Sequence, residues 1–581
     1  MFARPSTRLR AVPVIALTAV TCAVTMILRY NAPEGSLGGL TDDHFYFVTL
    51  GWQMLFGELP DRDYFEPGAP LTLAISAALQ TLLGRSIWSE YVFCVAVLAV
   101  GSAITFVLAA RSSGSILLGL GAFLFQFALL PRLYGYPKIV IYAAAIGALW
   151  AWAASPGTRR TWVVAVITAV AFLLRHDHGI FVGFGFLVVL LSIGNMPVGQ
   201  RAKQALIYAV TLVALLTPYL AYLQFNGGIE RHFVTTYAWS ERDYGRSPRV
   251  LPTFERRDVF QDAETDAPAS EWWEHAPFAG LSEYSTFWLF WFFMALPVVA
   301  LLVLLMNPAH GPPDWSQERA KMLAVIAIAA VVDWRFLRGN LAGRLADVSV
   351  PMSILAAWVL AKVGAVVLRG RVEIAGRQRP VGGVTRGAIG VVTGVLVLVT
   401  ALVLVRPFVG ALENARATEG LESMRSGAAL VTNRLQHTWP LASDESASRT
   451  DFALARYLQA CTAPTDRVLI TEFHPQIAGL AQRGFAAGHV DLRGGGFFGT
   501  VSEQELTVQR WQRQSVPLVL GPTSRDYPDW AENLPLVARY LNGAYRNLGE
   551  KNVGGFTFLL FERRDARVVR TYAPLGFPCF R

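Results

Sequence analysis

The chain has 581 residues, of which 53% are hydrophobic and 16% charged, and its mean hydropathy is +0.38. These values exclude an ordinary soluble enzyme, and apolar segments recur too often for a single membrane anchor. The net charge of +9 comes from 51 basic and 42 acidic residues. In a membrane protein such a charge is first sorted by membrane side, so we predict no nucleic-acid partner.

Apolar segments long enough to cross a bilayer recur about eleven times along the chain. They lie at residues 11–29, 90–110, 115–131, 137–154, 160–174, 178–195, 205–224, 284–306, 321–334, 346–368 and 387–406. The first resembles a signal peptide because basic residues precede it, but it has no convincing small-residue cleavage site and more spans follow. We therefore expect it to remain as a helix.

The basic loops predict the orientation of these spans. With the N-terminus in the cytoplasm, the short basic loops and the run of arginines at 369–386 fall inside, as the positive-inside rule requires. This holds only if the short apolar segment 70–84 lies along the outer surface instead of spanning. We predict a multi-pass protein of the bacterial cytoplasmic (inner) membrane with a cytoplasmic N-terminus and a periplasmic C-terminal domain.

Asp42 and Asp43 follow the first span directly. Two carboxylates at the water-facing mouth of a membrane helix are costly to hold there and are suited to proton abstraction or cation binding. They are the first candidate catalytic residues. The structural alternative is that Thr41 and the two aspartates cap a helix that begins at His44.

Basic side chains return at the predicted outer ends of later spans, where few are expected. Guanidinium and ammonium groups match phosphate oxygens, so these residues are the candidates for binding a donor phosphate: Arg132, Lys138, Arg175, Arg335 and Arg338. Simpler roles stay open. Lys138 can be a snorkelling interfacial lysine, Arg175 can pair with Asp177, and at least one of Arg335, Arg338 and Arg344 is expected to pair with Asp333 or Asp347.

Aromatic side chains near these charges are candidates for contacting the substrate. Tyr136 and His178 accompany the basic residues, and Tyr237 and Trp239 lie in the long outer loop 225–283. Such rings stack on sugar faces or anchor at the lipid interface, and both uses fit. The i, i+2 spacing of His176 and His178 lacks further ligands, so we predict no metal site.

The composition changes after the last span. Residues 410–450 are a polar, partly helical connector, and 451–581 alternate helix-like and strand-like segments such as DFALARYLQA, RVLITEF and FTFLLFER. This pattern predicts a small α/β domain outside the membrane. Cys461 and Cys579 lie near its ends and can form a disulfide in an oxidising compartment, whereas Cys22 and Cys94 lie in apolar spans and are expected to pack there.

The order of these features carries a resemblance. A basic N-terminus, one span, an acidic pair that opens a long first loop (30–89), the segment RDYFEPGAPLT and an amphipathic helix ending in LLGRS together resemble the GT-C glycosyltransferases. Within them the closest pattern is that of protein O-mannosyltransferases and bacterial lipid A aminoarabinose transferases. The resemblance covers 1–409 in plan and about 41–85 in motif. Those enzymes carry Asp-Glu where this chain has Asp-Asp.

The resemblance implies a polytopic all-α membrane module with a C-terminal extracytoplasmic α/β domain. It implies transfer of a sugar from a polyprenyl-phosphate donor to a lipid, glycan or protein hydroxyl at the membrane. Asp42 matches the catalytic base, with Asp43 in support, and no nucleotide-sugar site is required. No cofactor is predicted with certainty, and the need for a divalent cation stays open.

Three other functions remain as alternatives. A transporter or lipid-carrier flippase usually places its charges at the bilayer centre on broken helices, whereas these charges gather at one predicted face. A membrane receptor would use the outer domain to bind a partner, and the unassigned 451–581 region keeps this open. A ligase or polymerase on the same lipid carrier would depend more on arginine and histidine than on an acidic pair.

Overall fold

A computed structural model describes residues 11–31, 42–194, 196–245, 251, 285–306, 313–334, 344–374, 377–437, 450–492 and 499–581. The described chain is mostly helical and forms two compact units. Unit 1 contains Met1–Pro33, Cys94–Thr217 and Ser247–Ala428, and unit 2 contains Glu34–Phe93, Pro218–Arg246 and Ala429–Arg581. This division follows spatial contacts, whereas the boundaries at 409 and 450 remain predictions from the sequence.

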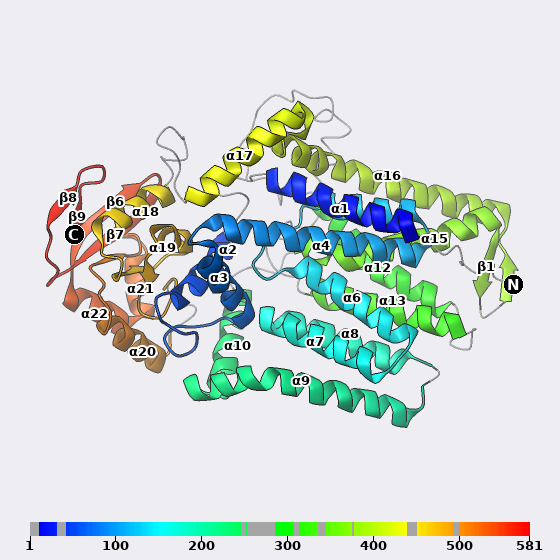
Figure 1. The fold of residues 1–581 in the computed structure, drawn as a ribbon, viewed down its shortest axis with the longest axis horizontal. Helices are drawn as coiled ribbons and strands as arrows, with labels where there is room; N and C mark the ends of the chain where they lie inside the picture. The colour runs from blue at the N-terminus through cyan, green and yellow to red at the C-terminus, as the bar shows by residue number, and fades with distance from the viewer. Residues whose placement is uncertain are drawn as a thin grey trace. The chain divides into compact units, whose positions relative to one another are not determined.

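A helix is present at each of the predicted spans. These helices are α1 (Ala11–Asn31), α4 (Ile87–Ser113), α5 (Ile116–Ala128), α6 (Lys138–Ala154), α7 (Thr158–Leu174), α8 (His176–Ser192), α9 (Val198–Asn226), α12 (Ser285–Leu305), α13 (Pro313–Trp334), α15 (Ser349–Arg369) and α16 (Gly383–Asn414). Within unit 1, α6, α7 and α8 pack side by side (Figure 1).

Several of these helices suit a lipid environment. Among the described residues, six helices are long and apolar enough to cross a membrane: α1, α4, α9, α12, α16 and the segment Ala346–Arg369 that ends in α15. Large apolar side chains such as Val210, Val213 and Val395 are exposed on them, as expected where lipid replaces water. The predicted polytopic helical fold class is confirmed, and the number of crossings stays a prediction.

Shorter elements complete unit 1 and lead out of it. The predicted cytoplasmic arginine run contains an antiparallel hairpin of β1 (Arg371–Ile374) and β2 (Arg377–Pro380). The 3₁₀ turns η2 (Ala346–Val348) and η3 (Ala417–Glu419) precede α15 and α17 (Leu421–His437). Helix α17 supplies the helical part of the predicted connector at 410–450.

The first part of unit 2 is also helical. It contains α2 (Asp42–Met54), α3 (Pro70–Leu83) and α10 (Ile229–Gly245), and α2 and α3 pack against each other. The segment expected to lie along the surface is thus a helix, and its 14 residues are too short to span a bilayer of ordinary thickness.

The C-terminal part of unit 2 is the predicted α/β domain. Its helices are α18 (Thr450–Cys461), α19 (Pro475–Ala481), α20 (Val501–Gln512), α21 (Tyr527–Asn533) and α22 (Pro535–Ala544). Its strands are β3 (Arg467–Ile470), β4 (Gly484–Phe485), β5 (Leu518–Leu520), β6 (Tyr545–Val553), β7 (Phe556–Arg563), β8 (Arg570–Tyr572) and β9 (Phe577–Cys579).

A five-stranded sheet in the order β4-β3-β5-β7-β6 organises this domain (Figure 1). The first three strands are parallel to one another, β7 runs antiparallel to β5, and β6 pairs antiparallel with β7 as a hairpin. Buried side chains including Leu469, Trp511, Val519, Trp530 and Phe561 form one core between the sheet and its helices. The strands are rich in apolar residues because packed helices cover them.

The structure answers the open question about the cysteines. Cys461 at the end of α18 is bonded to Cys579 in β9, 118 residues later, and the backbone N–H of Phe580 donates to the carbonyl of Cys461 at 2.8 Å. The bond closes the domain near both ends. Cys22 and Cys94 take no part in a disulfide, and Cys94 is buried, as predicted for a packing residue.

Replacing both bonded cysteines by serine in the full chain should lower the free energy of unfolding of the C-terminal domain by about 2–5 kcal/mol, because the bridge restricts the unfolded chain. Denaturant unfolding followed by the fluorescence of the buried tryptophans measures this. Cys22→Ala is the control and should leave the transition in place. An unchanged midpoint in the double serine variant would show that the bridge contributes nothing to stability.

Candidate functional site

The acidic pair lies at the start of a buried helix. Asp42 and Asp43 are the first two residues of α2. The helix therefore begins two residues before His44, where the capping alternative places its start. The structure describes the backbone of the two aspartates but not their side chains. Phe45, Val48 and Leu50 of the same helix are almost fully buried. Packing therefore fixes the helix axis, and the catalytic roles of the pair stay predictions.

Lys138 is the centre of a buried cluster in unit 1. It is the first residue of α6, its side chain is 9% exposed, and its Nζ lies 2.5 Å from Oδ2 of Asp347. The same nitrogen lies 4.3 Å from the ring centre of Tyr134 and 5.4 Å from that of Tyr136. Lys138 is thus a buried ion-paired cation among aromatic rings, not a snorkelling lysine, and its partner Asp347 is one of the two aspartates proposed from the sequence as arginine partners.

Arg175 belongs to the same cluster. It is the residue between α7 and α8, its Nε lies 3.2 Å from Oδ1 of Asp177, and its guanidinium carbon lies 5.0 Å from the ring centre of Tyr136. The predicted alternative of an Arg175–Asp177 pair is confirmed. Gly179 permits this corner, because a Cβ there would collide with Phe172 of α7.

His178 packs beside these charges. Its Nδ1 lies 2.6 Å from the hydroxyl of Tyr142, and its ring centre lies 6.0 Å from that of Tyr136. The side chain is buried and its Nδ1 faces the Tyr142 hydroxyl, so these contacts hold the imidazole ring in one orientation. A direct contact with substrate stays a prediction for Tyr136 and His178.

A cavity adjoins the cluster within unit 1. Its empty space, counted out into the open mouth, is about 320 Å³, of which about 20 Å³ has room for the centre of a water molecule. Arg132, Tyr134, Lys138 and Asp347 form its polar wall, and Arg132 donates to the Tyr134 hydroxyl at 3.3 Å. The remaining wall is mostly apolar: Cys94, Val97, Leu98, Pro131, Leu133, Pro137, Ile139 and Val140. A cationic wall facing an apolar one suits an amphiphilic anion such as a lipid phosphate.

The structure says less about the four remaining predicted site residues. Arg335 and Arg338 lie outside the described residues. Tyr237 and Trp239 both lie on α10 of unit 2; Tyr237 is 67% exposed, and the Trp239 ring centre lies 6.2 Å from that of Phe65. Their contact with a substrate stays a prediction.

A second polar cluster lies in unit 2, and the sequence reasoning missed it. His232 on α10 has its Nδ1 2.7 Å from Oδ1 of Asp61 and its Nε2 3.9 Å from Oε2 of Glu66. The Tyr219 hydroxyl donates to the same Glu66 oxygen at 3.4 Å and lies 3.2 Å from His232 Nε2. The three ionisable groups each offer an atom within 4.8 Å of the others.

This cluster has the chemistry of a divalent-cation site. Glu66 and His232 Nε2 can be ligands, while Asp61 can accept from Nδ1 and so favours the tautomer whose Nε2 carries a lone pair that a metal can bind. Glu66 stands in the quoted segment RDYFEPGAPLT, but 166 positions separate it from His232. Only the fold reveals that they meet.

Without a metal, the same groups hold protons. Burial and the nearby Asp61 carboxylate raise the pKa of Glu66 from 4.5 to about 7. Burial acts to lower the pKa of His232, but the hydrogen bond to Asp61 and the Glu66 charge outweigh it and raise that pKa. Both folded-state values thus exceed the unfolded-state values.

Metal-free protein in EDTA should therefore lose stability as the pH rises from about 4.5 to about 7. In this window the unfolded chain has released the Glu66 proton while the folded state still binds it, so the free energy of unfolding falls, and His232 acts in the same direction. Thermal unfolding against pH measures this. Glu66→Gln should flatten the profile and surface Glu505→Gln should not; equal slopes in all three proteins would contradict the assignment.

Two solved structures resemble the chain over nearly its whole length. The crystal structure of ArnT from Cupriavidus metallidurans bound to undecaprenyl phosphate is 11% identical, covers 96% of this chain and 98% of that chain, and has a TM-score of 0.48. The apo state of that protein is 11% identical, with 95% and 97% coverage and a TM-score of 0.44. No family model and no curated protein matches.

ArnT is a lipid A aminoarabinose transferase of GT-C fold, so the two similar structures come from the group that the sequence resembles. At 11% identity and TM-scores below 0.5, the likeness carries no argument about activity or individual residues. The contacts described above have to carry any statement about chemistry.

Proposed function

We propose that this protein transfers a sugar from a polyprenyl-phosphate-linked donor to an acceptor hydroxyl at the outer face of the cytoplasmic membrane. The observation that carries the proposal is the buried cluster around Lys138, in which cations and aromatic rings border a cavity with an apolar wall. A polyprenyl phosphate is complementary to both features, because its anionic head can meet the cations and its apolar chain can meet the apolar wall.

The charges of the cluster suit a phosphate that leaves. Lys138, Arg175 and Arg132 are cationic, and Asp347 and Asp177 partly neutralise them. When the bond between the sugar C1 and the phosphate oxygen breaks, the phosphate keeps the bonding electrons and gains negative charge. Preorganised cations stabilise that charge most strongly where water is excluded. Asp347 shares Lys138 with the phosphate and so limits how tightly the substrate is held before the bond breaks.

The acceptor side needs a base. As the acceptor oxygen bonds to C1 of the sugar, its proton has to pass to a carboxylate, and Asp42 is our candidate. Asp43 supports it by electrostatics or by holding an adjacent group. The cluster of Asp61, Glu66 and His232 offers a place for a divalent cation in the same unit as Asp42. The acceptor class, whether lipid, glycan or protein, is left open by this chemistry.

The orientation belongs to the same proposal. The Cys461–Cys579 bond is of the kind that forms in an oxidising compartment, which supports a periplasmic C-terminal domain. A periplasmic domain agrees with a cytoplasmic N-terminus and with an outer-face reaction.

Asp42→Asn should lower kcat for sugar transfer by about 10²–10⁴-fold, because the amide cannot accept the acceptor proton. The measurement uses purified protein in lipid nanodiscs with a polyprenyl-phosphate sugar, and binding of the polyprenyl phosphate is followed separately and should persist. Asp43→Asn is the neighbouring comparison and should lose less. If Asp42→Asn transfers sugar at the wild-type rate, Asp42 is not the base.

Lys138→Gln should raise KM for the lipid-linked donor about tenfold or more, because a charge-assisted contact with phosphate is lost. Asp347→Asn is the matched control, since it breaks the same ion pair but keeps the cation. This control should bind the donor as well as wild type or more tightly. If both variants weaken donor binding equally, the pair acts in folding and not in phosphate recognition.

A further inference from the structure

The helix that begins with Asp42 is held by the C-terminal domain. Within unit 2, α2 packs against α3, against α19 and against strand β4, and the last two belong to residues 475–485. Gly479 of α19 shows how close this approach is, because a Cβ there would lie 3.1 Å from Oγ1 of Thr49 and 3.3 Å from the Trp52 ring. The helix therefore has a protein surface on the side of the C-terminal domain.

Hydrogen bonds fix α2 along its axis. The Thr49 hydroxyl donates to the carbonyl of Pro475 at 3.0 Å. The Gln53 amide bonds twice to Phe485: its Nε2 donates to the Phe485 carbonyl at 3.1 Å, and its Oε1 accepts from the Phe485 N–H at 3.1 Å. Phe485 lies in the edge strand β4, so the Gln53 side chain pairs with the sheet edge as a further strand would.

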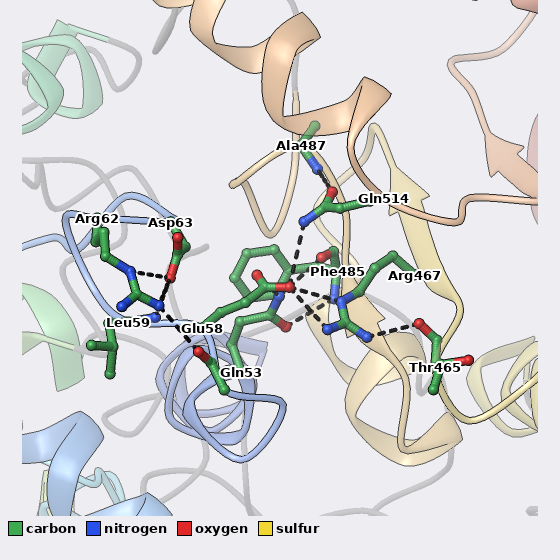
Figure 2. Close-up of polar contacts among 11 residues, drawn as sticks. Gln53, Glu58, Leu59, Arg62, Asp63, Thr465, Arg467, Phe485, Ala487 and Gln514 are labelled. Carbon is green, nitrogen blue, oxygen red and sulfur yellow. Dashed lines mark hydrogen bonds and ion pairs between the residues drawn. The ribbon is translucent and has the colours of Figure 1, made fainter.

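A half-buried ion pair continues the contact beyond the end of α2. Both the Nε and a terminal nitrogen of Arg467 lie 2.9 Å from Oε1 of Glu58, and the side chains are 12% and 15% exposed. Figure 2 shows Glu58 reached by Gln53, Arg467 and Gln514; Gln53 donates to its Oε2 at 2.5 Å. The Arg467 guanidinium also lies 4.7 Å from the ring centre of Phe56.

The loop after Glu58 is held from the same domain. The Arg510 guanidinium donates to the carbonyl of Arg62 at 3.0 Å, and the Phe65 N–H donates to the carbonyl of Gly488 at 3.0 Å. Asp63 accepts from the Leu59 N–H at 2.8 Å and from Arg62, as Figure 2 also shows. These contacts set the path of the chain up to Glu66.

We propose that the C-terminal domain is a positioning element of the active centre, with Gln53, Glu58 and Arg467 as its positioning residues. The contacts join the domain to α2 and to the loop of Asp61 and Glu66, so they set the position of the helix that begins with Asp42. The inference rests on the proposed function, because it assigns Asp42 as the base. It gives the domain a role in catalysis without requiring any of its side chains to touch substrate.

Glu58→Gln and Arg467→Met, each in the full chain in nanodiscs, should lower kcat for sugar transfer about 10-fold to 10²-fold, since small displacements of a reacting group cost rates of this size. KM for the donor should stay within about twofold of wild type, because the proposed phosphate-binding residues belong to unit 1. The double variant should be no worse than the singles, as expected of residues that act as one pair.

The charge-swapped double variant, Glu58→Arg with Arg467→Glu, should regain part of the lost kcat, which a purely structural defect would not predict. Glu562→Gln is the matched control: it breaks an ion pair of the same 2.9 Å length with Arg546, between β6 and β7. This control should keep both kcat and KM. Single variants with wild-type kcat overturn the proposal, and so does a fall in kcat that Glu562→Gln shares.

A second pair of variants makes smaller changes and tests the proposal even if the ion-pair variants do not fold. Thr49→Val removes one hydrogen bond to Pro475 and keeps the side-chain shape, and it should lower kcat a few-fold. Thr105→Val removes a hydroxyl that bonds within its own helix, to Gly101 at 2.9 Å, and should leave kcat unchanged. Equal activity of the two variants overturns the proposal. Absence of transfer by the wild-type protein is a different result, which overturns the proposed function itself.

Discussion

Burying charge is the physical constraint on which the described arrangement depends. An ion removed from water loses hydration energy that only a well-placed partner offsets. Lys138 meets Asp347, Arg467 meets Glu58, and His232 lies between Asp61 and Glu66. Each pair joins elements far apart in the chain. Their placement therefore does more than stabilise, since it specifies which helices and loops have to come together.

The sequence predicts the parts of this arrangement that depend on local pattern. Apolar length predicts a helix at each span, and the alternation of helix-like and strand-like segments predicts the α/β domain with its strands near RVLITEF and FTFLLFER. The acidic pair, the basic outer residues and the resemblance to GT-C enzymes follow from motif order. All of these signals are contained in short stretches of chain.

The pairings could not be predicted, because periodicity carries no information about partners. Lys138 and Asp347 are 209 positions apart, and the sequence suggested Asp347 only as one of two aspartates that could pair with an arginine. Glu58 and Arg467 are 409 apart. His232 lies in a helix predicted only as part of a long aromatic loop. Arg175 with Asp177 is the exception, since two residues of separation made the pair visible in the sequence.

The make-up of unit 2 has a consequence for how the protein is synthesised. The helix that begins with Asp42 is hydrogen-bonded to Pro475 and Phe485, and the loop that leads to Glu66 is hydrogen-bonded to Gly488 and Arg510. These partners emerge from the ribosome more than 400 residues later, as the 426 positions between Thr49 and Pro475 illustrate. Closing so long a loop costs conformational entropy before any contact can offset that cost. A chain whose translation stops in the apolar helices thus carries the acidic pair but lacks the contacts that hold its helix, and these contacts form only once the final segment has been made.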